Sequence, residues 1–177
     1  MVLSGCVRSP LLVSRLVVSR GVLSYGGTES RCAVGRGGIR RGKVEGDGAT
    51  PAGVFPLRQV LFRPDRVGAL ESGLPARALS PADGWCDDPA DARYNTLVPL
   101  PCAARHEALW RADNLYDVIV VIGYNDAPPV PGKGSAIFLH VAQPDFSPTA
   151  GCVAVPLPAL LNVVRCCSLA TMIEIDE

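Results

Sequence analysis

The chain has 177 residues, 48% hydrophobic and 19% charged, a balance that indicates one globular domain with a sizeable core and excludes a disordered chain. The formal net charge is zero, although 11 basic and 4 acidic residues lie up to Arg66, and 6 basic and 13 acidic residues lie beyond it. No aromatic side chains are interleaved with the basic ones, and no zinc-finger spacing occurs. We therefore expect a solvated basic face and no nucleic-acid partner.

The first predicted elements are short β-branched runs over residues 11–18 and 22–25, which flank Arg20-Gly21 and predict a hairpin. We expect residues 1–28 to pack as hairpin strands on the same domain that residues 29–177 form. Arg8, Arg15 and Arg20 interrupt the apolar runs, so no signal peptide is visible. No stretch reaches the length of a membrane-spanning helix.

Residues 32–34 form a third candidate strand, and the polar residues 35–48 predict a long surface loop. A strand is predicted over 55–62. Residues 63–97 are rich in Pro, Asp and Gly, and an excursion this long favours a lid or a wall of a binding cleft. Its acidic residues are compatible with a cation, but solvated turn positions are the favoured interpretation. These acidic residues are Asp83, Asp87, Asp88 and Asp91.

The second half of the chain begins with helical spacing over residues 103–111, which places His106 on a helix surface. The near-continuous apolar run 116–123 predicts a central strand, and 134–141 predicts the next buried strand. A short strand over 152–155, a helix over 156–167 with proline at its start, and an edge strand over 171–175 follow. The chain is thus predicted to be mainly β, a β-sandwich with two short helices.

The strongest chemical signal is His140 at the end of a predicted strand, with Cys152 following 12 residues later after Gly151. A cysteine with a nearby imidazole is a minimal nucleophile-and-base pair, and a preceding glycine allows backbone N–H groups to face an oxyanion. Cys152 as one of seven inert core thiols and His140 as a satisfied buried imidazole is an open alternative. No Cys-x-x-Cys pair occurs, and we predict no metal and no cofactor.

Two motifs resemble the L,D-transpeptidase (YkuD-type) catalytic domain over residues 29–177. These are Thr50-Pro-Ala-Gly-Val-Phe55, and His140 followed by Thr149-Ala-Gly-Cys152-Val. The resemblance implies a YkuD-like β-sandwich and a cell-wall enzyme of the bacterial periplasm or cell envelope. It implies that a stem tetrapeptide of peptidoglycan is cleaved before D-alanine through a Cys thioester and transferred to an amine, giving 3→3 cross-links. Carbapenem-type inhibitors are expected to acylate such an enzyme.

By position, the resemblance implies Cys152 as nucleophile, His140 as proton donor and acceptor, and Gly151 in the oxyanion hole. It implies Thr149 shaping the loop and the Val141 carbonyl orienting the histidine, and Tyr124 is expected to wall the substrate site.

The chain departs from the usual family sequence at Ala150, where a histidine is common, and at Ala154, where a polar residue is common. The second departure affects recognition of a substrate carboxylate more than it affects the Cys–His chemistry. An L,D-carboxypeptidase or amidase on the same scaffold, and a non-catalytic peptidoglycan-binding module, are the alternative interpretations.

Overall fold

The computed structural model describes residues 12–177, so residues 1–11, which include the first residue of the predicted strand 11–18, lie outside it. The strands in chain order are β1 (Arg15–Ser19), β2 (Val22–Tyr25), β3 (Thr28–Arg31), β4 (Ile39–Arg40), β5 (Thr50–Pro51), β6 (Gly53–Phe62), β7 (Ala76–Ala78), β8 (Asp83–Cys86), β9 (Leu97–Pro99), β10 (His106–Ala108), β11 (Val118–Ile122), β12 (Phe138–Val141), β13 (Val153–Val155) and β14 (Met172–Ile175). The helices are α1 (Pro64–Val67) and α2 (Leu157–Cys166).

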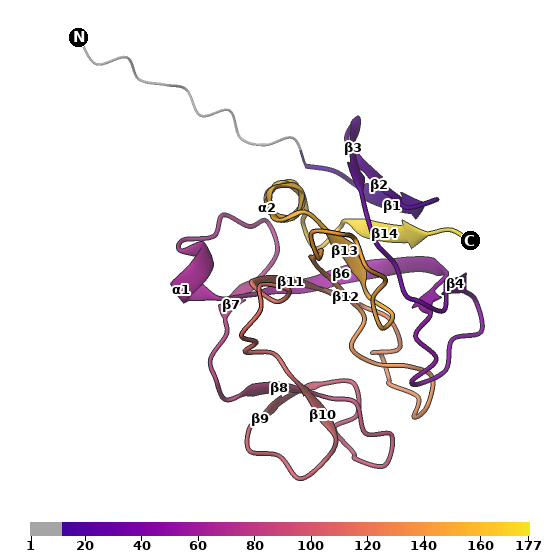
Figure 1. The fold of residues 1–177 in the computed structure, drawn as a ribbon, viewed down its shortest axis with the longest axis vertical. Coiled ribbons are helices and arrows are strands. Elements are labelled where there is room, and N and C mark those ends of the chain that lie inside the picture. The colour runs from indigo at the N-terminus through magenta and orange to yellow at the C-terminus, as the bar shows by residue number, and fades with distance from the viewer. Residues whose placement is uncertain (1–11) are drawn as a thin grey trace.

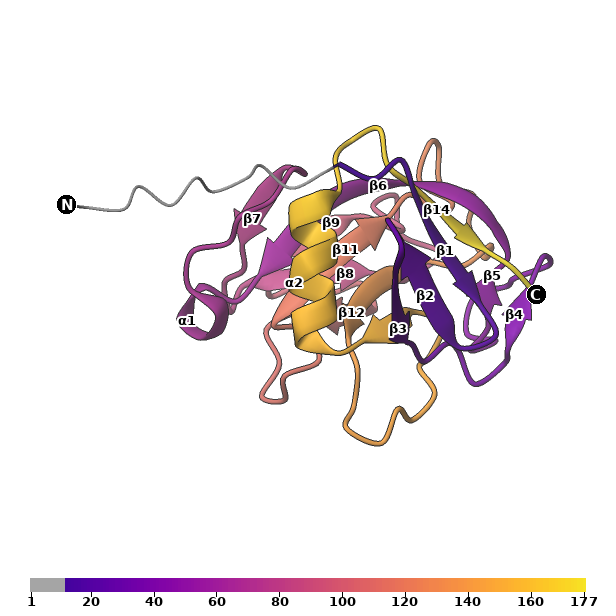
Figure 2. The same ribbon diagram turned by 90° about the horizontal axis from the view of Figure 1, so that it is seen from above.

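Eight of these strands form one large mixed sheet in the order β13-β12-β11-β6-β14-β1-β2-β3, with β7 added beside β6. The long strand β6 curves across the molecule and joins the β1–β3 end to the β11–β13 end (Figures 1 and 2). A separate three-stranded sheet, β10-β8-β9, lies below it in Figure 1, and β4 pairs with β5. The predicted mainly β sandwich with two helices is confirmed.

Strand β11 is buried along its whole length because it has a hydrophobic core on each face. Val118, Val120 and Ile122 pack into the larger core, which α2 and β14 also line. Ile119 and Val121 pack into a second core together with residues of β8 and β12. A strand covered on both faces has no polar side, which explains the continuous apolar run and confirms its predicted central position.

The predicted opening hairpin is present as β1 and β2. Arg20 and Gly21 have φ angles of 51° and 76°. Positive φ at both positions is the type I′ geometry, whose twist matches that of the flanking strands. The hairpin joins the large sheet through β1, which pairs in parallel with β14.

Two predicted elements are wrong in kind or place. Residues 103–111 contain strand β10, not a helix, because His106, Glu107 and Ala108 pair with β8. A helix of nine residues has little stability of its own, so this pairing overrides the helical spacing. Strand β14 is not an edge strand, because β6 and β1 pair with its two sides.

Other boundaries shift by a few residues. The third strand is Thr28–Arg31, and the predicted segment 32–34 contributes only a bridge between Ala33 and Ala154. Strand β12 occupies only the last part of the segment 134–141. The short helix α1 begins with proline inside a region predicted to be loop, and the loop 35–48 contains β4. The predicted helix at 156–167 is α2.

Candidate active site

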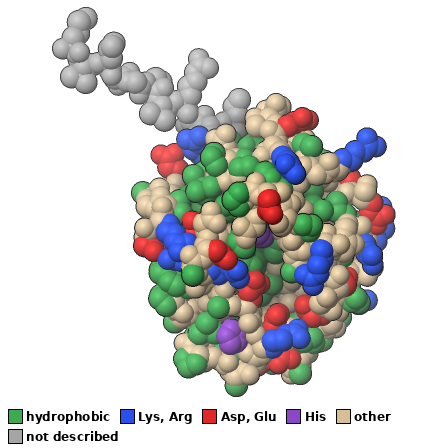
Figure 3. Space-filling view, in the orientation of Figure 1, with side chains coloured by type: hydrophobic (Ala, Val, Ile, Leu, Met, Phe, Trp, Pro, Cys, Tyr) green, Lys and Arg blue, Asp and Glu red, His purple; other side chains and the backbone are tan. Residues whose placement is uncertain are grey.

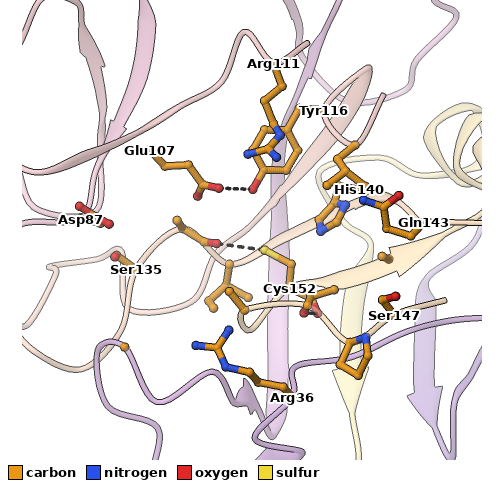
Figure 4. Close-up of a pocket in the computed structure, with 18 of the residues that line it drawn as sticks. Arg36, Asp87, Glu107, Arg111, Tyr116, Ser135, His140, Gln143, Ser147 and Cys152 are labelled. Carbon is orange, nitrogen blue, oxygen red and sulfur yellow. Dashed lines mark hydrogen bonds between the residues drawn. The ribbon is translucent and has the colours of Figure 1, made fainter. Parts of the chain in front are cut away.

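His140 and Cys152 lie on the walls of one cavity of about 730 Å³ (Figure 4). Strand β12 turns Phe138 toward the second core, and His140, two residues on, lies on the same face. His140 is opposite Ala154 of β13, and Cys152 directly precedes that strand. The parallel pairing of β12 with β13 therefore brings together the two residues that the sequence predicted as a pair.

The imidazole of His140 is held in one orientation. Its Nδ1 lies 2.8 Å from the Val141 carbonyl oxygen, so Nδ1–H donates there and Nε2 is left without a proton. Its ring packs edge-on against Tyr116, with centroids 5.3 Å apart. The residue is 5% exposed, and burial lowers its pKa to about 4. His140 is thus a neutral base at neutral pH.

The Cys152 thiol lies in an apolar position, with 7% of the residue exposed. Its Sγ donates to the Ala136 carbonyl at 3.2 Å and accepts from the Phe138 N–H at 3.4 Å. Burial, with a smaller contribution from Glu107, raises its pKa to about 12. The resting pair is therefore a thiol and a neutral imidazole, and the hydrogen bonds of the thiol are made with backbone and not with His140.

The residues before Cys152 form a tight loop. Gly151 has a φ of 144°, and a Cβ there would lie 2.9 Å from the Ala49 carbonyl oxygen, so only glycine fits. Thr149 Oγ1 donates to the Cys152 carbonyl at 2.6 Å and accepts from the Gly151 N–H at 3.1 Å. An oxyanion at the Gly151 amide would have to compete with Thr149, which shapes this loop.

The Thr-Pro motif is close to the nucleophile although it lies about 100 residues earlier. Thr50 is fully buried, and its Oγ1 approaches the Cys152 carbonyl oxygen at 3.4 Å. The hydroxyl oxygen of Thr50 also accepts a hydrogen bond from the Gly35 N–H at 2.8 Å. Thr50 thus fixes the backbone of the Cys152 loop to the loop 35–48.

Lys43 is a site residue that the sequence analysis missed, because it lies in the segment predicted to be a polar surface loop. Its side chain is only 3% exposed and pairs with Asp47, Nζ to Oδ1, at 2.9 Å. A Cβ on Gly151 would lie 3.5 Å from Lys43 Nζ, so the cation lies beside the Cys152 loop. Its charge favours the thiolate form of Cys152.

The opposite wall comes from the region around β8 and β10. Glu107 accepts a 2.5 Å hydrogen bond from the Tyr116 hydroxyl, and Arg111 lies over the Tyr116 ring (Figure 4). Asp87, from the segment 63–97 expected to wall a cleft, also lines the cavity. Because residues 103–111 were predicted to be a helix, the sequence analysis did not identify Glu107 as a residue of the cavity. The position of this residue on the cavity wall depends on β10 pairing with β8.

The remaining residues that the sequence analysis singled out differ in their relation to the cavity. Tyr124 is not among the lining residues: its ring packs against Phe55 and its hydroxyl donates to the Lys133 carbonyl. Ala150 and Ala154 do line the cavity, as does Arg36, whose N–H donates to the Thr149 carbonyl. The Val141 side chain belongs to the larger core, and only its carbonyl serves the site.

Three of the four acidic residues singled out in the segment 63–97 pair with arginine side chains, and the fourth, Asp88, accepts the backbone N–H groups of Ala90 and Arg105. Asp83 pairs with Arg77, Asp87 with Arg105 and Asp91 with Arg93. Within residues 12–177, no group of three or more His, Cys, Asp or Glu is placed to hold a metal ion. Over the same residues, no helix is both long and apolar enough to cross a bilayer.

Comparison with known proteins gives one match. A family model of the L,D-transpeptidase catalytic domain (YkuD) matches residues 14–175. No curated protein and no solved structure matches the chain. The match includes the hairpin β1–β2 and therefore begins earlier than the resemblance over residues 29–177. Because it covers almost the whole length, the chain belongs to the L,D-transpeptidase (YkuD) catalytic domain family.

Proposed function

We propose that this protein is a cysteine acyltransferase that cleaves peptidoglycan stem tetrapeptides before D-alanine and transfers the acyl group to an amine. The observation that carries the proposal is the shared cavity of Cys152 and His140, in which Val141 fixes the imidazole with Nε2 available as a base. Membership of the L,D-transpeptidase family supports the reaction class. Peptidoglycan stem peptides as partners, and the periplasm or cell envelope as the location, belong to the same proposal.

In the acylation step, Cys152 Sγ attacks the carbonyl carbon of the third stem residue. The C–S bond forms, the C–N bond to D-alanine breaks, and the thiol proton passes through His140 Nε2 to the leaving amine. The pKa of Cys152 is about 12 and that of His140 about 4, so prior transfer to an ion pair is costly. We infer that proton transfer accompanies C–S bond formation, after the thiol has broken its hydrogen bond to the Ala136 carbonyl.

In the second step, an amine of another stem attacks the thioester. The new C–N bond forms, the C–S bond breaks, and His140 moves the amine proton to the departing sulfur. We expect the Cys152 and Gly151 amides to donate to the carbonyl oxygen, and the Gly151 amide becomes available if Thr149 Oγ1 gives up its hydrogen bond. Lys43 adds positive charge beside this loop.

Arg36 is our candidate for the polar residue missing at Ala154. Ala154 exchanges two backbone hydrogen bonds of 2.8 Å with Ala33. Arg36 comes from the neighbouring loop, lines the cavity and is exposed at its mouth. A guanidinium there is suited to a substrate carboxylate, which it can bind through two parallel hydrogen bonds.

Intact-mass spectrometry after incubation with a carbapenem tests the acyl-transfer site. We expect a single adduct on the wild-type protein, its loss in Cys152→Ala, and its retention in Cys32→Ala, which removes another buried thiol outside the cavity. No adduct on folded wild-type protein would contradict the proposed chemistry and favour a non-catalytic peptidoglycan-binding module.

The acceptor is identified separately from the product of a stem tetrapeptide. A cross-linked dimer requires an amine acceptor. Release of tripeptide and D-alanine without a dimer would instead identify an L,D-carboxypeptidase, in which water resolves the same thioester.

A further inference from the structure

Glu107 is a partly buried carboxylate that the proposed acylation does not use. It lies on β10, and its side chain points into the cavity above Cys152 (Figure 4). One oxygen accepts the Tyr116 hydroxyl at 2.5 Å. Burial raises its pKa, which reflects the cost of holding a charge there.

The charged groups near Glu107 are engaged elsewhere. Arg111 binds Asp113 through two hydrogen bonds of 2.8 and 2.6 Å, and Asp87 pairs with Arg105. Over the described residues 12–177, no cation lies within ion-pair distance of Glu107, whereas Lys43 on the facing wall is paired with Asp47. Acidic and basic side chains are likewise mixed over the face seen in Figure 3. Glu107 is thus a cavity carboxylate whose partner is a hydroxyl and not a cation.

The charge of Glu107 also affects the pKa of the Cys152 thiol. The groups that face Glu107 are Tyr116, Arg111, Asp87 and, across the cavity, Cys152. After burial, the negative charge of Glu107 is the largest contribution that raises the pKa of Cys152. A cation beside Glu107 would cancel this repulsion, because two opposite charges in a partly buried site attract strongly.

We propose that Glu107, oriented by Tyr116, forms a subsite for a primary ammonium group of the substrate, and that filling this subsite activates the Cys152 thiol. The identity of the ligand as a substrate rests on the proposed function. A primary ammonium group carries three N–H donors and a positive charge, and it could form the ion pair with Glu107 that Arg111, bound to Asp113, does not form. An enzyme built in this way keeps its thiol unreactive until a cationic substrate is bound.

Alkylation of Cys152 by iodoacetamide tests the subsite without turnover. The rate at Cys152 is followed by peptide mapping, because six other cysteines are present. Glu107→Gln keeps the size of the side chain and an acceptor for Tyr116. We expect about tenfold faster alkylation than in the wild type, since the repelling charge is gone. Glu71→Gln, an exposed position outside the cavity, is the matched control and should leave the rate unchanged.

Pentylammonium chloride is the ligand probe, and 1-pentanol is its uncharged control. Pentylammonium should accelerate alkylation of the wild type several-fold and leave Glu107→Gln unaffected, whereas pentanol should affect neither. An unchanged or slower rate in Glu107→Gln would overturn the inference. The inference would also be overturned if pentylammonium did not accelerate alkylation of the wild type, or if it accelerated alkylation equally in both proteins.

The carbapenem acyl-enzyme separates the two possible sources of the ammonium group. Release of the acyl group as a pentylamide, lost in Glu107→Gln, assigns the subsite to the acceptor amine. If pentylammonium accelerates alkylation of Cys152 but no pentylamide is released, the subsite is assigned to an ammonium group on the acyl donor. Carbapenem acylation with no effect of Glu107→Gln would overturn the inference alone. A Glu107→Gln effect without any carbapenem adduct would instead overturn the proposed function alone.

Discussion

His140 should make the protein sensitive to acid, and the size of the effect follows from its burial. In the unfolded chain its pKa is 6.5, and in the folded protein burial lowers it to about 4. The folded state therefore binds a proton less readily, and stability present above pH 6.5 is lost as the pH falls toward 4. The difference of about 2.5 pKa units corresponds to about 3 kcal/mol of unfolding free energy, most of it lost by pH 4.

The assay is urea denaturation of the wild type and His140→Gln at pH 7, 5 and 4. Carboxylates such as Asp47 and Asp83 also lose stability in acid, because their folded pKa values are lowered. These carboxylates are present in both proteins, so their contribution to the loss of unfolding free energy cancels when the two proteins are compared. We expect the wild type to lose about 3 kcal/mol more than His140→Gln between pH 7 and pH 4. Parallel losses in the two proteins would refute a buried neutral imidazole at this position.

Two further predictions concern the cations of the site. Lys43→Met leaves Asp47 without its ion partner, so urea denaturation should show a loss of about 3 kcal/mol of unfolding free energy. The same variant should slow iodoacetamide alkylation of Cys152, since Lys43 lowers the pKa of that thiol; an unchanged rate would contradict this role. Arg36→Ala should change the unfolding free energy by less than about 0.5 kcal/mol, because the residue is exposed. It should raise KM for a stem peptide with a free carboxylate, and an equal rise for the corresponding amide would argue against carboxylate recognition.

Some features of the fold could be predicted from the sequence because short-range physics dominates them. The apolar run at β11 has no polar side to expose, so a strand buried on both faces is its stable arrangement. The Arg20-Gly21 step suits the positive φ angles of a hairpin turn. The helix α2 begins where proline is tolerated.

Other features depend on partners far away in the chain. The helical spacing around His106 and Leu109 is real, but pairing of β10 with β8 stabilises a strand there. The segment 171–175 alternates as an edge strand would, yet β1 and β6 both pair with it. Local spacing carries no information about which strands will lie beside a segment, so these two predictions were wrong.

The sequence by itself determined the mainly β character of the fold, and it predicted His140 and Cys152 as a pair, which the structure places on the walls of one cavity. Alternating or continuous apolar runs and the residue types around Gly151 are sufficient for those conclusions. Only the tertiary structure decided what surrounds the pair. Lys43 and Glu107 lie 64 residues apart in the chain and look like solvated charges in the sequence. Folding places both on the walls of the cavity that contains Cys152, where low exposure to water strengthens their opposite effects on the thiol.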